Sequence, residues 1–222
     1  MRLKNYLIEL YDPQTGEKLG SDFDESVNIF ADLVRKNCGP YLKALKGKEP
    51  FIRGMRQVEK YYFPHISGGK KPTRQSREPK LFPKEAFGPL NNYLEKQGGA
   101  RRDKSVIATT ISRTLSFGPM YWIFPIGRLK YSYVTSHDFN EDSGIWDPKR
   151  AVTFFLGNYP PAEKKDYEEY FKNKIIHNKN LEKAYEHQYE IWFECKEYYF
   201  FLAQPKSYGI SLLKNLNLVP KI

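Results

Sequence analysis

The stretch that decides the fold is Gln188–Cys195, QYEIWFEC, which is followed by the aromatic run Tyr198–Phe201, YYFF. Side chains alternate between the two faces of a strand. The odd-numbered residues of QYEIWFEC therefore form one apolar, core-like face, and the even-numbered residues place an amide, a tryptophan and two carboxylates on the other. A polar face of this kind either lies at a water-exposed edge or lines a cleft. We expect residues 198–203 to be the hairpin partner of this strand.

The rest of the chain is predicted to combine helices with antiparallel strands. Strands are expected at residues 6–11, 50–55, 105–111, 120–126, 129–135 and 152–156, and helices at 24–45, 83–97, 162–176 and 180–187. Gly39-Pro40 should break the first helix, residues 56–80 read as a basic loop, and residues 207–219 form a closing strand or short helix. Helices come first and strands dominate afterwards, which is typical of the α+β class.

The composition favours an anionic partner. Of 222 residues, 36 are Lys or Arg and 26 are Asp or Glu, which gives a formal charge of +10. The basic tracts 69–80 and 101–104 stand out, and such charge suits nucleic acid, an acidic protein or a phosphate-bearing cofactor. With two cysteines, no secretory signal and no long apolar run, we expect a cytoplasmic protein that does not enter a membrane.

Several common functional motifs are missing. The chain has no phosphate-binding loop, no dinucleotide-binding glycine pattern, no HExxH and no paired CxxC. Residues 138–144 begin like a calcium loop, but Lys149 occupies the position where that loop needs a glutamate. We therefore expect no metal site.

Three short motifs lie in order on the expected strands. They are Phe51-Ile52-Arg53-Gly54, then Ala108-Thr109-Thr110 followed by Phe117-Gly118-Pro119-Met120-Tyr121, and finally Gln188-Tyr189-Glu190. Together they resemble the ADP-ribosyltransferases of the Arg–Ser/Thr–Glu type, in the variant with Gln-x-Glu as the last motif. The resemblance spans residues 50 to 203. A basic Lys-Pro tract at Lys71-Pro72 and the sequence Phe124-Pro125-Ile126-Gly127, read as a hairpin, are also similar to virus-encoded sequences, including those of bacteriophages.

This resemblance implies a fold and a domain division. The fold would be a split antiparallel β-sandwich with N-terminal and inserted helices, within the α+β class. Residues 50–222 would form the ADP-ribosyltransferase-like domain, and residues 1–49 an N-terminal strand and helix extension to the same compact unit.

The resemblance also implies residue roles toward NAD. Arg53, at a strand end beside Gly54, would fork the pyrophosphate oxygens with its guanidinium. Glu190 would stabilise the oxocarbenium character that develops when the nicotinamide–ribose bond breaks. Thr109 and Thr110 would tie the neighbouring strands together and position Glu190.

Four further residues complete the implied site. Phe117 and Tyr121 are the candidates for stacking on nicotinamide. Gln188 would face the acceptor, and an amide there goes with amide-like or base acceptors instead of arginine. Ala108 departs from the family pattern, because a serine usually opens this motif; a degenerate binding module therefore remains an alternative.

The sequence thus leads to three hypotheses. The first is a mono-ADP-ribosyltransferase that uses NAD as substrate and modifies a nucleic-acid base (DNA or RNA) or a protein side chain. The second is a non-catalytic basic module whose aromatic strands stack on single-stranded nucleic acid. The third is a viral structural or interaction protein on the same fold.

Overall fold

The computed structural model describes residues 22–55, 66–76, 84–110, 118–135, 171–172, 174–187, 189–203 and 206–218. The chain divides into two compact units, each formed by segments distant in the sequence. The first unit consists of Met1–Lys71, Ser112–Gly127 and Tyr198–Ile222, and the second of Pro72–Ile111 and Arg128–Glu197. The strands expected at 6–11 and 152–156 lie outside the described residues.

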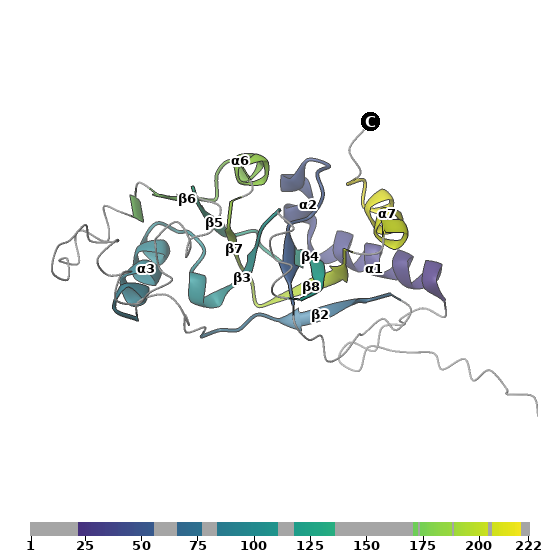
Figure 1. The fold of residues 1–222 in the computed structure, drawn as a ribbon, viewed down its shortest axis with the longest axis horizontal. Coiled ribbons are helices and arrows are strands. Elements are labelled where there is room, and N and C mark those ends of the chain that lie inside the picture. Colours follow the sequence, from purple (N-terminus) through teal and green to yellow (C-terminus); the bar gives the residue numbers. More distant parts are fainter. Residues whose placement is uncertain are drawn as a thin grey trace, which may run out of the picture. The chain divides into compact units, whose positions relative to one another are not determined.

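The first unit contains a four-stranded sheet of order β1-β4-β8-β2 (Figure 1). Its strands are β1 (Ile52–Gly54), β2 (Gly68–Pro72), β4 (Met120–Pro125) and β8 (Glu197–Leu202), and its helices are α1 (Phe23–Asn37), α2 (Gly39–Leu45) and α7 (Lys206–Asn215). β4 pairs antiparallel with both β1 and β8.

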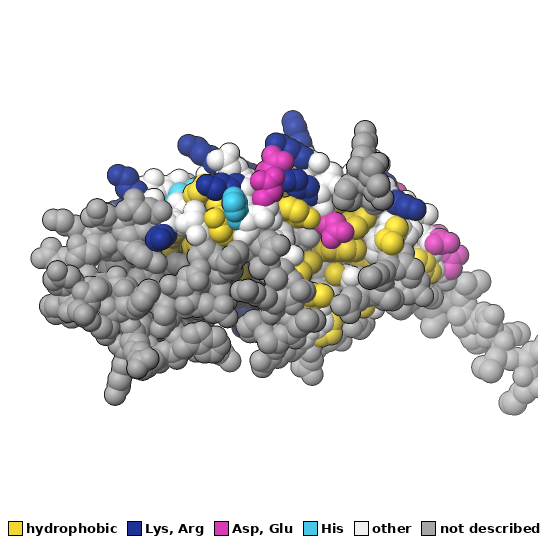
Figure 2. All heavy atoms as spheres, turned by 45° about the horizontal axis from the view of Figure 1, so that its top comes forward, with side chains coloured by type: hydrophobic (Ala, Val, Ile, Leu, Met, Phe, Trp, Pro, Cys, Tyr) yellow, Lys and Arg dark blue, Asp and Glu magenta, His cyan; other side chains and the backbone are white. Residues whose placement is uncertain are grey.

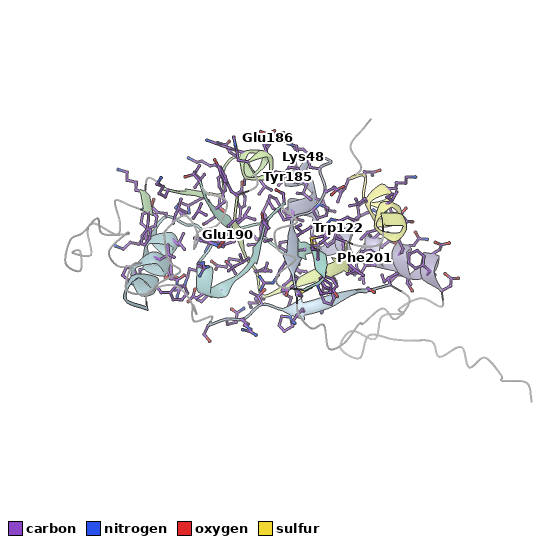
Figure 3. The ribbon with its side chains drawn as sticks, viewed as in Figure 1. Lys48, Trp122, Tyr185, Glu186, Glu190 and Phe201 are labelled. Carbon is purple, nitrogen blue, oxygen red and sulfur yellow. The ribbon has the colours of Figure 1, made fainter. Side chains whose placement is uncertain are left out.

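Aromatic side chains build the core of this unit. Phe30 of α1 meets the rings of Phe124 and Tyr199 edge-on, at centroid distances of 6.2 and 5.7 Å. Trp122 stacks on Phe201 (Figure 3). α7 approaches this stack through Gly209, where an added Cβ would lie 2.3 Å from the indole ring of Trp122. Only a glycine permits that approach.

The second unit contains a four-stranded sheet of order β3-β7-β5-β6. Its strands are β3 (Ser105–Ala108), β5 (Tyr131–Val134), β6 (Ile175–His177) and β7 (Ile191–Glu194); α3 (Lys84–Lys96), the short 3-10 helix η1 (Arg102–Lys104) and α6 (Leu181–Glu186) complete it. α3 and α6 lie on opposite faces of the sheet (Figure 1). Leu90 and Leu94 of α3 pack with Trp192 and Val134 in one buried cluster.

The α+β class is confirmed, because helices combine with two antiparallel sheets. The prediction of two hairpins, one from β7 and β8 and one from β4 and β5, is wrong. β7 and β8 belong to different sheets although only Cys195 and Lys196 separate them. β4 and β5 also belong to different sheets, and the boundary between the two units falls between them, after Gly127. The reason is that these strands are apolar on both faces. Each becomes an inner strand with partners on both sides, which buries more apolar surface than a two-stranded hairpin.

Two elements differ from expectation. Gly68–Pro72, read as part of a basic loop, forms strand β2, because pairing with β8 satisfies its backbone and Leu202 N–H donates to the Ser67 carbonyl just before it. Ile175 and Ile176, expected at the end of the helix 162–176, belong instead to strand β6 (Ile175–His177) beside β5, in keeping with their β-branched side chains. The closing segment takes the helical alternative as α7.

The boundary expected at residues 49 and 50 does not coincide with a boundary between the two units. α1 and α2 belong to the first unit together with β1. The Tyr41 hydroxyl accepts a hydrogen bond from Phe51 N–H at 3.0 Å, and the Cys38 thiol donates to the Phe124 carbonyl. None of the helices in the described part of the chain is long and apolar enough to cross a membrane.

Candidate active site

Two of the sequence motifs lie on neighbouring strands of the second unit. β3 and β7 pair antiparallel, with Ser105 opposite Glu194 and Ala108 opposite Ile191. One step further along the same register aligns Thr109 with Glu190. Directly opposite residues of an antiparallel pair share a face of the sheet. Continued in this way, the register sets Thr109 and Glu190 at opposite positions of the two strands, with their side chains on the same face of the sheet.

The two threonines point to opposite faces, so they are not equivalent. Thr110 lies on the α6 side, where its hydroxyl donates to the Tyr185 carbonyl at 3.3 Å. Thr109 shares the α3 side with Glu190. Of the two residues expected to position Glu190, only Thr109 is on the correct face to do so.

Glu190 is almost buried, with 8% of its surface exposed. Its Oε1 accepts a hydrogen bond of 2.6 Å from the indole Nε1–H of Trp192 and forms an ion pair of 3.5 Å with Nη2 of Arg102. The Arg102 guanidinium also lies over the Trp192 ring, 5.6 Å from its centroid. Arg102 and Trp192 are themselves buried. One carboxylate oxygen is therefore held by a hydrogen bond and an ion pair in an enclosed environment.

Glu190, Trp192 and Glu194, the described residues of the even-numbered face of QYEIWFEC, do not lie at a water-exposed edge of the sheet. β7 is an inner strand between β3 and β5, and Trp192 is fully buried in the cluster with α3. Glu190 precedes the first residue of β7, where a tenth of its side chain reaches the surface. The described part of this face is thus a core tryptophan with a carboxylate at each end of the strand.

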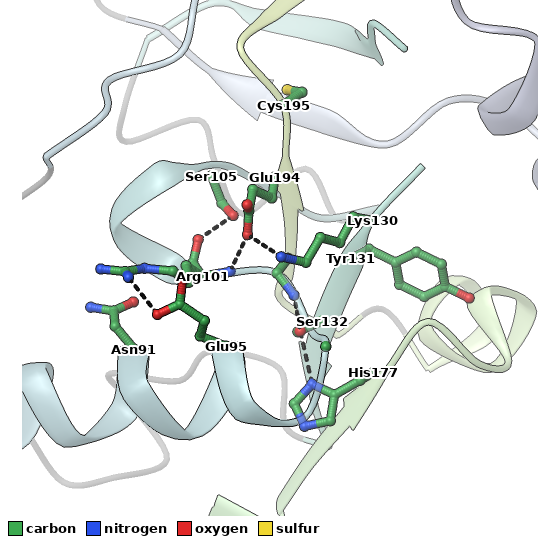
Figure 4. A network of polar contacts seen from close by, with 12 residues as sticks. Asn91, Glu95, Arg101, Ser105, Lys130, Tyr131, Ser132, His177, Glu194 and Cys195 are labelled. Carbon is green, nitrogen blue, oxygen red and sulfur yellow. Dashed lines mark hydrogen bonds and ion pairs between the residues drawn. The ribbon is translucent and has the colours of Figure 1, made fainter. Parts of the chain in front are cut away.

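The second carboxylate, Glu194, anchors the turn that carries Arg102. Its Oε2 accepts hydrogen bonds from the Arg101 backbone N–H at 2.8 Å and from Lys130 Nζ at 3.0 Å (Figure 4). The Arg101 side chain pairs with Asp103 at 2.7 Å, and this hydrogen bond raises the pKa of Arg101 further above its ordinary value. Glu194 thus has a structural role at the half-buried end of the strand.

A serine–histidine pair across β5 and β6 was not anticipated from the sequence. Ser132 Oγ accepts from Ala100 N–H at 2.8 Å and contacts His177 Nδ1 at 2.9 Å (Figure 4). Burial lowers the pKa of His177 to about 4, so the ring is neutral at pH 7. Ser132 is fully buried, which removes it from the reach of a substrate. A single histidine at 177 carries no local signal that would have revealed this contact.

In the first unit, β1 and β4 bring Arg53 opposite Tyr121 and Gly54 opposite Met120. Arg53 is half-buried. The Tyr121 ring is 2% exposed and meets Phe200 edge-on at 5.6 Å. Such burial favours a packing role for Tyr121 over stacking on a ligand. Phe117 and Gln188 lie outside the described residues.

The aromatic residues of the strands do not form an exposed stacking surface. Those of the described strands are all buried: Tyr121, Trp122, Phe124, Tyr131, Tyr133, Trp192, Phe193, Tyr198, Tyr199, Phe200 and Phe201. Lys and Arg side chains are interspersed with acidic ones on the face drawn in Figure 2. Within the residues that can be placed, no cluster of His, Cys, Asp or Glu suits a metal ion. The expected stacking platform for single-stranded nucleic acid therefore has no support from the described strands.

Comparison of the chain with protein-family models, curated proteins and solved structures gave no match.

Proposed function

We propose that the protein is an NAD-dependent ADP-ribosyltransferase in which Glu190 is the catalytic carboxylate. The observation that carries the proposal is the register of β3 and β7, which pairs Ala108 with Ile191 and, continued by one residue, aligns Thr109 with Glu190 on one face of the sheet. Two motifs noted separately in the sequence therefore meet at the start of one strand. The carboxylate there is held in one orientation by Trp192 and Arg102, as a group that must stabilise a developing charge requires.

The reaction breaks the bond between C1′ of the ribose and the nicotinamide nitrogen. The bonding electron pair leaves with nicotinamide, and C1′ acquires oxocarbenium character. The Glu190 carboxylate stabilises this positive charge and accepts a hydrogen bond from a ribose hydroxyl. The acceptor then forms the new bond to C1′ and releases a proton. Binding of the NAD pyrophosphate by Arg53 stays a separate prediction, tested by its own variant, Arg53→Ala.

The acceptor class follows from charge and from Gln188. The net charge of +10 suits a polyanion, and an amide at position 188 suits a base or an amide side chain instead of arginine. We propose a nucleic-acid base or a non-arginine protein side chain as the acceptor. Incubating the protein with labelled NAD and cell lysate, followed by nuclease or protease treatment, identifies the polymer that carries the label.

The decisive experiment compares two carboxylates of the same strand region. Glu190→Gln keeps the size and the hydrogen-bond acceptor but removes the charge, and nicotinamide release from NAD should fall by about 10²–10³-fold. The matched control is Glu194→Gln, because Glu194 also has a cationic partner, Lys130, and a glutamine there can still accept the Arg101 N–H that anchors the turn carrying Arg102. It should keep its turnover within about threefold. Equal turnover by wild type and Glu190→Gln would refute the proposal.

A further inference from the structure

The Glu190 carboxylate is held asymmetrically. Both contacts that the described residues make with it, from Trp192 Nε1 and from Arg102 Nη2, go to Oε1. A carboxylate has two oxygens and can accept about four hydrogen bonds. Both described contacts are on Oε1, so within the described part of the chain Oε2 keeps its capacity to accept a hydrogen bond from a ligand. The side chain is a tenth exposed, so the carboxylate is enclosed but still borders the surface.

Arg102 lies in a turn whose flanking residues are fixed by hydrogen bonds and an ion pair. Its neighbour Arg101 is fixed through its backbone N–H to Glu194 and through its guanidinium to Asp103. The backbone N–H of Asp103 donates to Oδ1 of Asn91, a buried residue of α3, at 3.2 Å. Both residues flanking Arg102 are thus tied to the body of the unit. The position of the Arg102 guanidinium is therefore set by a fixed stretch of backbone, unlike that of an arginine on a mobile surface loop.

A buried ion pair such as Arg102–Glu190 contributes little net stability to a fold. Removing a carboxylate and a guanidinium from water has a large desolvation cost, and apolar residues of similar volume often stabilise a core equally well. Trp192 already fills the core beside Leu90 and Leu94. The Nε1–H of its ring nevertheless makes its short bond to Oε1, so the tryptophan joins the packed core to the carboxylate.

From these contacts we infer that Arg102 and Trp192 are positioning residues, which hold Oε1 of Glu190 and direct Oε2 toward the substrate. We call Arg102 and Trp192 together the clamp. The inference rests on the proposed function, because the clamp is inferred to orient the carboxylate that the proposed function makes catalytic. The Trp192 N–H fixes the orientation of the carboxylate through a directional hydrogen bond. The charge of Arg102 attracts the same oxygen and keeps the carboxylate from rotating toward other donors. The clamp acts through Glu190 and need not touch NAD.

The first test reads the clamp without relying on turnover. In the full-length protein, the indole N–H proton resonance of Trp192 is assigned by its loss in Trp192→Phe. Glu190→Gln replaces a charged acceptor by a neutral one and should shift this resonance upfield by several tenths of a ppm or more, whereas Glu194→Gln should leave it in place. An unchanged resonance in Glu190→Gln would overturn the clamp itself.

The second test separates positioning from folding by steady-state kinetics with NAD. Trp192→Phe keeps the ring and removes the donor, and Arg102→Lys keeps the charge and loses the planar fork. Each should lower kcat by about 10–100-fold and change KM by less than threefold, because a misdirected carboxylate weakens the transition state more than ground-state binding. Arg102→Met should lose more than Arg102→Lys, since it lacks the charge.

The outcomes distinguish the two proposals. Wild-type kcat in both Trp192→Phe and Arg102→Lys, together with a large loss in Glu190→Gln, overturns the positioning role and leaves the proposed function standing. No nicotinamide release by the wild type overturns both, and a shifted Trp192 resonance would then mark the clamp as structural. A fall in kcat that merely follows a fall in the folded fraction, measured by urea unfolding of each variant, also counts against positioning.

Discussion

Gly99 is the position where a single methyl group should disturb the second unit most. It follows α3 and lies against the serine–histidine pair. A Cβ built on Gly99 would be 2.2 Å from His177 Nδ1 and 2.6 Å from Ser132 Oγ. Real Cβ atoms essentially never approach other heavy atoms so closely. In Gly99→Ala the imidazole ring or the backbone must therefore move.

The magnitude follows from what that movement breaks. Overpacking of a filled site costs about 1–3 kcal/mol. Displacing Ser132 Oγ also removes the acceptor of the Ala100 N–H, a buried donor whose loss of partner costs about 1–3 kcal/mol. Because the His177 ring blocks any shift of Ser132 that keeps its hydrogen bond to Ala100, and because the ring itself can move only in part, we expect a total of about 2–4 kcal/mol. In a chain of this length that lowers Tm by roughly 5–15 °C.

The assay is urea unfolding followed by circular dichroism, in two backgrounds. The control is Gly99→Ala combined with His177→Ala, because the nearest clashing ring is then absent and the Ser132 hydroxyl can shift into the space it leaves while still accepting the Ala100 N–H. We expect Gly99→Ala to cost less than half as much in that background, which is a coupling energy of at least about 1 kcal/mol. An equal cost in both backgrounds, or no cost in either, would refute the packing described for Gly99.

Two further predictions concern buried titratable groups. The Tyr133 hydroxyl is buried without a hydrogen-bond partner among the residues described, and burial helps raise its pKa to about 12. Tyr133→Phe should therefore leave the free energy of unfolding unchanged or raise it by up to about 2 kcal/mol. The control is Tyr41→Phe, which removes the acceptor of Phe51 N–H and should lower the free energy of unfolding by about 1 kcal/mol. An equal loss of stability in the two variants would contradict this prediction. His177 has a pKa of about 4 when folded and about 6.5 when unfolded, so the unfolded chain binds more protons between these values. The free energy of unfolding should therefore be highest above about pH 6.5 and fall toward pH 4, by less than about 1.4 kcal/mol per pH unit because solvent screens the charge. Urea unfolding midpoints measured at several pH values should show a smaller dependence on pH in His177→Gln. An unchanged dependence would exclude His177 as its origin.

The helices were predictable because their signals are local. Gly39-Pro40 marks a break in the sequence, and in the structure α1 ends at Asn37 and α2 begins at Gly39. Gly98-Gly99 marks the end of α3 in the same way, with Gly98 in the left-handed region at φ +68°. Such signals act over a few residues, so they survive in a fold whose longer-range contacts are not visible in the sequence.

Sheet partners were not predictable because they depend on long-range competition. The short link between β7 and β8 is the length of a hairpin turn, and both strands have the composition of hairpin strands. Each nevertheless pairs with strands distant in sequence: β7 with β3 and β5, and β8 with β4. Strands that are apolar on both faces leave the choice of partner open, since alternation identifies only one buried face.

The candidate site shows the same division between local and distant information. The order of the motifs led to Glu190 and to the threonines, but the sequence did not distinguish Thr109 from Thr110 or reveal the donors on Oε1. Arg102 was the largest omission, because it lies in the tract Arg101–Lys104 that reads as a surface turn. Only the buried carboxylate distinguishes Arg102, at 4% exposure, from an ordinary surface arginine.

The burial of Arg102 also changes how the net charge should be interpreted. The tract 101–104 contributed to the expectation of a polyanionic partner, yet Arg101 pairs with Asp103 and Glu95, and Arg102 pairs with Glu190. Charges neutralised by internal partners contribute little to the field outside the protein. A nucleic-acid acceptor, if it binds through charge, must therefore contact other basic residues. Neutralising Lys179 and Lys183, which are exposed, should weaken nucleic-acid binding and reduce its dependence on salt. Arg101→Ala should instead act mainly on the stability of the turn, because Arg101 pairs with Asp103.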